Sequence, residues 1–154
     1  MLKIFPSQTD KDLEITRELF VEYAESLEFD LCFQNFEQEL TGLPGEYSQP
    51  YGCILLAEYE GQTAGCVAVR KLKDSVCEMK RLYVKPQFRR FKIGKALAKE
   101  SIKQAKAMDY KRMWLDFITP RPAESLYRSL GFREIEPYED IPFDGAVFME
   151  LKIV

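Results

Sequence analysis

Basic side chains dominate residues 80–95, a stretch in which every charged residue is Lys or Arg. It begins as a strand-like segment, breaks at Lys85-Pro86, turns through a basic loop over residues 87–92, and enters a helix at about Ile93. A helix N-terminus offers unpaired N–H groups and roughly half a positive charge, and arginines add forked donors. The order of strand, basic turn and helix therefore predicts a phosphate site. The basic residues are Lys80, Arg81, Lys85, Arg89, Arg90, Lys92 and Lys95.

Two common phosphate motifs are absent from the sequence. Because neither GxxxxGK[ST] nor GxGxxG occurs, neither a nucleoside triphosphatase nor a dinucleotide-binding fold is favoured. The net charge is −3, so the basic stretch stands against a mildly acidic background. That contrast favours a local anion site, and no nucleic-acid partner is expected. A nucleic-acid-binding domain that stacks bases on Tyr83, Phe88 and Phe91 is the less favoured alternative.

The chain contains no histidine, which limits the chemistry open to it. Ser-His-Asp and Cys-His catalysis are excluded, so a general acid or base must be a carboxylate, Tyr, Cys, Lys or a relayed water. The cysteines show no CxxC spacing, and no metal site is expected. Reduced thiols, with Cys66 and Cys77 interpreted as core residues, favour a cytoplasmic protein. Neither a signal-peptide core nor a membrane span is expected.

The elements that position these residues follow from hydrophobic periodicity, caps and turn residues. We expect one domain over residues 1–154, in which a helix after the basic loop joins two parallel strands. A second helical segment carries Phe33, Phe36 and Leu40, which are interpreted as core or as one wall of a substrate pocket. The expected strands are 2–5, 53–59, 63–69, 75–84, 111–117, 133–136 and 146–153, and the expected helices begin at Thr9 or Asp10, near Phe33, at Ile93 and at Pro122.

Two motifs in this order resemble the GNAT superfamily of N-acetyltransferases. The basic loop is similar to its pyrophosphate-binding pattern [RQ]-x-x-G-x-[GA], with Arg89 first and Gly94 last. Lys92 replaces the first glycine. A left-handed backbone there would cost about 1–2 kcal/mol, whereas a right-handed turn would avoid that cost. The second pattern, A-x-x-L-Y-x-x-x-G-F, spans residues 123–132.

The resemblance implies an α/β (α+β) fold of the acyl-CoA N-acyltransferase type. Its mixed central sheet would have about seven strands flanked by about four helices. The fourth and fifth strands would splay apart and leave a V-shaped cleft for acetyl-CoA.

The resemblance also implies which residues bind acetyl-CoA. Backbone groups at the end of the fourth strand would pair with the pantetheine arm, and the basic loop would hold the pyrophosphate. Thr119 would stand in for an asparagine that the family often places after the fifth strand. The implied cofactor-binding residues are Leu82, Tyr83, Val84, Arg89, Arg90, Phe91, Lys92, Ile93, Gly94, Lys95 and Thr119.

The implied chemistry is direct acetyl transfer to a primary amine. Tyr127 matches the family's general acid, which protonates the departing thiolate; the alternative is a core tyrosine whose hydroxyl is satisfied. Glu78 matches the position of a general base in some members, or forms an ion pair with a neighbour such as Lys80 or Arg81. Asp116 is a second carboxylate that could face the cleft.

The implied acceptor is a primary amine of a small molecule or a peptide. Acidic residues of the helical segments and of the loop at 137–145 suggest a cationic acceptor. An inactive acetyl-CoA-binding sensor is the alternative function, and a homodimer is possible. The acidic residues concerned are Asp30, Glu37, Glu39, Glu139, Asp140 and Asp144.

Overall fold

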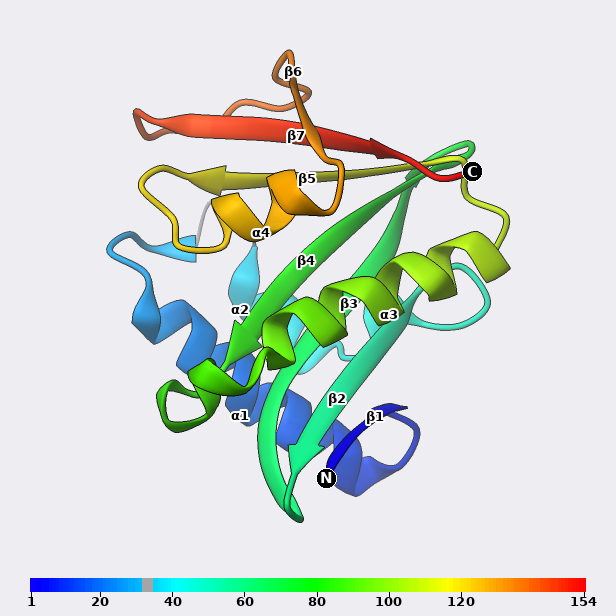
Figure 1. Cartoon of the computed structure of the whole chain (residues 1–154), viewed down its shortest axis with the longest axis vertical. Coiled ribbons are helices and arrows are strands. Elements are labelled where there is room, and N and C mark those ends of the chain that lie inside the picture. The colour runs from blue at the N-terminus through cyan, green and yellow to red at the C-terminus, as the bar shows by residue number, and fades with distance from the viewer. Residues whose placement is uncertain (32–34) are drawn as a thin grey trace.

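The computed structural model describes residues 1–31 and 35–154, whose strands form one mixed sheet of seven strands in the order β1-β2-β3-β4-β5-β7-β6 (Figure 1). Neighbouring strands run antiparallel except β4 and β5, which run parallel. The expected fold class and the parallel pair are therefore confirmed. The strands are β1 Leu2–Pro6, β2 Cys53–Tyr59, β3 Gln62–Lys73, β4 Val76–Val84, β5 Arg112–Ile118, β6 Arg133–Ile135 and β7 Ala146–Lys152.

The parallel strands β4 and β5 stop pairing soon after they begin. Within the described chain, residues 76–78 of β4 pair with residues 112–114 of β5. Beyond Glu78, β4 continues to pair with β3, and β5 continues to pair with β7. The facing edges of both strands are consequently open over several residues, and the expected splay is confirmed.

A bulge in β4 accompanies this separation. Cys66 pairs with Tyr83 and Ala68 with Lys80, so two residues of β4, Arg81 and Leu82, lie opposite one residue of β3. Arg81 has φ 61°, in the left-handed region. An extra residue bends and twists a strand, and here it turns the second half of β4 away from β5.

Helices cover both faces of the sheet (Figure 1). Alternate side chains of β2 show the division, because Leu55 lies in the core under α3 and Leu56 lies in the core under α1. Helix α1 begins with a capping box, in which Thr9 and Asp12 each accept a backbone N–H of the other. The described helices are α1 Asp10–Ser26, α2 Phe36–Thr41, α3 Ile93–Ala107 and α4 Glu124–Ser129, with 3-10 turns η2 Gly45–Tyr47 and η3 Pro86–Phe91.

Several expected boundaries need correction. The basic loop is the 3-10 helix η3, and β3 runs on to Lys73 because the hairpin with β4 is longer than expected. Helix α4 begins at Glu124, two residues after Pro122. One face of α3, which includes Ile93 and Ser101, is fully buried. Phe33 and Cys32 lie outside the described residues.

No helix in the described ranges combines the length and apolar character that a membrane span requires.

The sheet leaves no room for a side chain at Gly65 of β3. A Cβ there would lie 2.4 Å from the Tyr83 carbonyl oxygen, whereas a Cβ at Gly94 would lie 3.7 Å from its nearest neighbour, Val84 Cγ2. We expect Gly65→Ala to lower the free energy of unfolding by about 2 kcal/mol or more, because backbone must move. Gly94→Ala should change it by less than about 1 kcal/mol, since alanine suits a helix. Urea unfolding of the two variants measures this difference, and equal stabilities would contradict the close packing of β3 and β4.

Candidate active site

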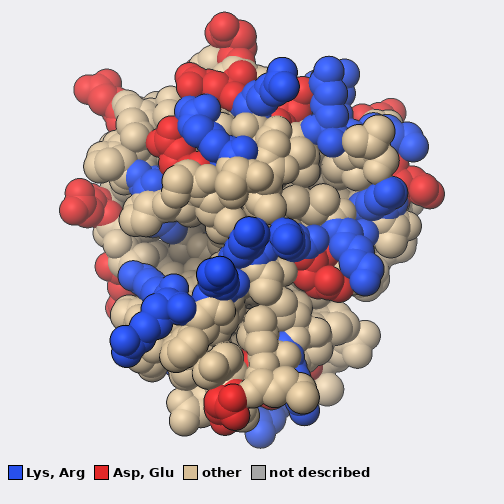
Figure 2. Space-filling view, in the orientation of Figure 1, with Lys and Arg blue, Asp and Glu red and all other residues tan. Residues whose placement is uncertain are grey.

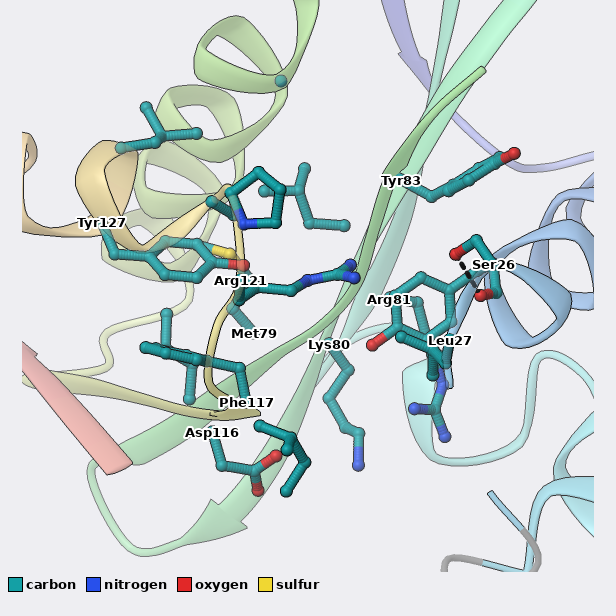
Figure 3. A pocket seen from close by; sticks show the side chains of 18 of the residues that line it. Ser26, Leu27, Met79, Lys80, Arg81, Tyr83, Asp116, Phe117, Arg121 and Tyr127 are labelled. Carbon is teal, nitrogen blue, oxygen red and sulfur yellow. Dashed lines mark hydrogen bonds between the residues drawn. The ribbon is translucent and has the colours of Figure 1, made fainter. Parts of the chain in front are cut away.

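A cavity of about 770 Å³ lies where β4 and β5 separate. Its walls come from α1 and the segment after it, from β4 and β5, from the first turns of α3 and α4, and from Ile141 and Phe143 of the segment before β7. Cavities of about 300–1,000 Å³ are typical of small-molecule sites. Figure 3 shows that side chains from both separated strands, including Lys80 and Asp116, border the open space.

One end of the cavity is the N-terminus of α3. Lys92 precedes this 15-residue helix with φ 59° and ψ 28°, and no side chain caps the helix. The left-handed backbone resolves the alternatives left open at Lys92: the residue adopts the conformation for which glycine is better suited. Because α1 has a full capping box and α3 has none, the first N–H groups of α3 are left for a ligand.

Basic side chains border this end of the cavity. Lys92 and Lys95 line it, and Figure 2 shows Lys and Arg side chains beside a hollow near η3 and α3. Arg89 also lines it, but its Nε donates to the Val84 carbonyl oxygen at 2.9 Å, and its guanidinium lies 5.7 Å from the Tyr83 ring centroid. The helix dipole and these cations together favour a phosphate.

Most predicted cofactor residues line the cavity, and three do not. Leu82, Tyr83, Val84, Arg89, Lys92, Gly94, Lys95 and Thr119 line it. Arg90 is exposed, Phe91 stacks on Tyr59 with ring centroids 4.5 Å apart, and Ile93 is buried in the core under α3. These three residues therefore do not line the cavity.

Tyr127 presents its hydroxyl to the cavity (Figure 3). Its ring packs among Phe117 and Phe132, with centroid distances of 5.8 and 5.9 Å. Among the described residues the hydroxyl has no hydrogen-bond partner, so it is not the satisfied core tyrosine of the alternative interpretation. Burial raises the pKa of Tyr127, which keeps the phenol protonated and able to donate.

Glu78 lies at the point where the strands part, and both its oxygens are occupied. Arg70 Nε donates to Oε1 at 2.9 Å, and the Tyr138 hydroxyl donates to Oε2 at 2.6 Å. Lys80 Nζ is 4.0 Å from Oε1. Glu78 is only 1% exposed, although it lines the cavity. Its principal ion-pair partner is thus Arg70 rather than Arg81, and its acceptor positions are already in use.

Asp116, on β5, has an oxygen without a partner. Its Oδ2 is buried and accepts no hydrogen bond from the described residues. Carboxylate oxygens of Asp116, Glu78 and Glu139 lie within 4.8 Å of one another. Burial and the adjoining Glu139 carboxyl raise the pKa of Asp116 to about 7. A carboxyl group that exchanges a proton near neutral pH and faces a cavity is suited to proton transfer.

Arg121, between β5 and α4, was missed by the sequence analysis. It lines the cavity, and its guanidinium lies 5.6 Å from the ring centroid of Tyr23 on α1. Phe29 and Phe143, whose ring centroids are 5.2 Å apart, form another part of the wall. Because these contacts join segments far apart in the chain, no local sequence signal could have found them.

The acidic residues that suggested a cationic acceptor do not line the cavity. Glu39 instead binds Arg81 through both oxygens, at 2.9 and 2.7 Å. The acids that do line the cavity are Glu28, Glu78 and Asp116. The site therefore gives no support to a preference for cations based on the residues named from sequence.

The described cysteines are core residues, as expected. Cys66 and Cys77 are fully buried, and burial raises the pKa of each thiol, to about 12 for Cys77. Neither is poised as a nucleophile.

Comparison with known proteins identifies the family. Residues 13–132 match the model of the acetyltransferase (GNAT) family. The chain belongs to the GNAT acetyltransferase family. An uncharacterized N-acetyltransferase of Schizosaccharomyces pombe is 41% identical over 146 residues, which cover 93% of this chain and 90% of that protein.

Solved structures of GNAT acetyltransferases share the fold. One from Staphylococcus aureus has a TM-score of 0.82 at 19% identity and covers 100% of both chains. PaiA N-acetyltransferase of Thermoplasma acidophilum, solved in complex with coenzyme A, has a TM-score of 0.74 at 22% identity and covers 99% of both chains. The predicted family, fold and acetyltransferase class are thus confirmed, and at these identities the structural likeness shows the fold alone.

The raised pKa of Asp116 makes stability depend on pH. The native state holds this proton more tightly than the unfolded chain does, so the resulting stabilisation is full below about pH 4 and is lost as pH rises to about 7. We expect Asp116→Asn to gain stability relative to the unsubstituted protein across that window. Urea unfolding at pH 5 and pH 8 measures the change, with exposed Asp109→Asn as the control. A stability difference between Asp116→Asn and the unsubstituted protein that does not vary with pH would contradict the raised pKa.

Proposed function

We propose that this GNAT acetyltransferase transfers the acetyl group of acetyl-CoA directly to a primary amine of a small molecule or peptide. One observation carries the proposal: a single cavity joins an uncapped helix N-terminus to the Tyr127 hydroxyl and to Asp116, whose Oδ2, like that hydroxyl, has no hydrogen-bond partner among the described residues. The first feature suits a phosphate-bearing donor, and the other two suit the proton transfers of aminolysis.

Acetyl-CoA is proposed to lie with its pyrophosphate on the N–H groups at the start of α3, beside Lys92 and Lys95. Gly94 leaves that approach open, because it presents no side chain to the cavity. The pantetheine arm would pair with the open edge of β4 at Leu82 and Val84, where β5 no longer does so. Thr119 is proposed as a further contact across the cavity.

The chemistry needs two proton transfers. The amine must lose a proton before its nitrogen bonds to the thioester carbon, and the sulfur must gain one as the C–S bond breaks. Tyr127 is proposed to give the second proton, since its phenol stays protonated and faces the cavity. The Tyr127 ring packs against Phe117 and Phe132, which restrict its motion, so little conformational entropy is lost when the hydroxyl donates its proton.

The first proton is proposed to go to the carboxylate pair of Glu78 and Asp116. Asp116 Oδ2 receives it directly, because that oxygen lacks a donor whereas both oxygens of Glu78 have one. Glu78 then contributes negative charge that favours the proton on its neighbour. This division assigns both predicted carboxylates a part in the same step.

A sensor that binds acetyl-CoA without turnover is the alternative. The Tyr127 hydroxyl, which has no hydrogen-bond partner within residues 1–31 and 35–154, argues against it, because a protein that only binds needs no proton donor facing the cavity. The cytoplasmic location and a possible homodimer stay predictions. The buried free thiols of Cys53, Cys66 and Cys77 agree with a reducing compartment.

Tyr127→Phe tests the enzyme and the acid together. With acetyl-CoA and a panel of primary amines, release of free CoA thiol should be observed for the unsubstituted protein. The variant should lose about 100-fold or more in kcat, with the Kd for acetyl-CoA little changed. The matched control is Tyr110→Phe, whose hydroxyl donates to the Tyr51 carbonyl oxygen outside the cavity. Unchanged turnover in Tyr127→Phe would remove the acid role, and acetyl-CoA binding without thiol release on any amine would favour the sensor.

The pH dependence of the rate distinguishes the two carboxylates. If Asp116 takes the proton, kcat/KM should fall as pH drops below about 7, and Asp116→Asn should lower kcat/KM by about 100-fold. Glu78→Gln should move this fall in kcat/KM to lower pH, because one of the negative charges that raise the pKa of Asp116 is gone. If kcat/KM of Asp116→Asn still fell as pH dropped below about 7, the base would be a group other than Asp116.

A further inference from the structure

Building on the proposed function, we propose that the amine acceptor carries a carboxylate beside its amine, and that Arg121 binds this carboxylate. The acceptor would thus be an amino acid. The inference concerns the half of the cavity that lies away from α3.

Arg121 is a cation placed in the cavity without a counter-charge. No carboxylate among the described residues pairs with it, whereas Arg70, Arg81 and Arg128 each pair with one. It is half-buried, and its guanidinium lies over the face of the Tyr23 ring. Stacking on a ring holds the guanidinium plane but leaves its N–H donors unused. Such a fork matches a carboxylate, which can accept two parallel hydrogen bonds.

The position of Arg121 separates it from the phosphate end. Figure 3 shows its side chain crossing the open space between Tyr127 and the Ser26–Leu27 turn. Its partner Tyr23 belongs to α1, which covers the sheet face opposite α3. The anion that Arg121 is proposed to bind is accordingly not the pyrophosphate proposed for α3, where Lys92 and Lys95 already supply positive charge.

The same cavity holds a matching acceptor for the ammonium group. Asp116 Oδ2 is buried and unpartnered, and Asp116 and Arg121 both face the open space in Figure 3. An amino acid carries an ammonium and a carboxylate a few bonds apart, so its charges complement those of Asp116 and Arg121. A polyamine would place a second cation near Arg121, and a peptide N-terminus would present a neutral amide there.

Amino acids compared with their carboxamides test the inference. The probes are L-alanine, L-aspartate, L-methionine and L-phenylalanine, their α-carboxamides, and spermidine, assayed by CoA thiol release. The α-amine of a carboxamide loses its proton more readily, with a pKa near about 8, so intrinsic reactivity favours the carboxamides. We expect at least one amino acid to exceed its carboxamide by about tenfold or more in kcat/KM, against that trend.

The variant Arg121→Gln tests whether Arg121 binds the carboxylate of the acceptor. It should lower kcat/KM for the preferred amino acid by about 10- to 100-fold, chiefly through KM, and leave its carboxamide little changed. The Kd for acetyl-CoA, measured by calorimetry, should not change. The control is Arg128→Gln on α4, whose guanidinium pairs with Glu124 outside the cavity and which should leave both rates unchanged.

Three outcomes would overturn the inference. They are a preference for carboxamides or spermidine, an equal loss on amino acid and carboxamide in Arg121→Gln, and a weakened Kd for acetyl-CoA, which would assign Arg121 to the donor. Failure of the proposed function looks different: acetyl-CoA would not bind, or no probe would release thiol even with Arg121 in place.

Discussion

The structure depends on the separation of β4 from β5, and a buried ion pair stabilises the separated arrangement. Arg81 occupies the bulge with φ 61°, a backbone conformation that costs a non-glycine residue about 1–2 kcal/mol. Its side chain is 2% exposed and binds both oxygens of Glu39, while the rings of Tyr23 and Phe36 lie 5.7 and 5.4 Å away. A buried ion pair adds little net stability but penalises any arrangement that separates its partners. The Arg81–Glu39 pair and the ring contacts of Arg81 thus favour the bulged pairing of β4 with β3, because any other pairing would move Arg81 away from α1 and α2.

Everything proposed for the site follows from this opening. Strand edges that would otherwise pair with each other face a cavity instead, so backbone groups of β4 are left for a ligand. The opening connects the two faces of the sheet, one bearing the helix N-terminus of α3 and the other bearing α1. A donor with a phosphate group and an acceptor with an amine can then approach the same point from different sides. The charges are arranged accordingly, with cations near α3 and partly neutralised carboxylates where the strands part.

The sequence predicted those parts that local rules determine. The order of elements and the start of α3 at Ile93 depend on periodicity, on proline and on glycine, and both were found as expected. Glu78 was singled out through the family resemblance, and in the structure it is the last residue of β4 that pairs with β5. The 3-10 helix at η3 was missed, since a six-residue basic segment gives no periodic signal.

Long-range contacts account for the remaining differences. The sequence could not tell that Arg70 and Tyr138 would occupy both oxygens of Glu78, because these residues are brought there by β3 and by the segment before β7. Glu39 was interpreted as a substrate-facing acid, but it forms an ion pair with Arg81, which lies 42 residues further along the chain. Arg121 depends on α1 in the same way. At Lys92 the backbone conformation was undecidable from sequence, since tertiary packing outweighs a cost of about 1–2 kcal/mol.

A crystal structure of the complex with coenzyme A tests the central claim most directly. We expect the pyrophosphate to lie on the N–H groups at the start of α3, and the pantetheine arm to run between β4 and β5. The thiol should then reach the Tyr127 hydroxyl. Coenzyme A bound outside this opening, or with its thiol remote from Tyr127, would contradict the account.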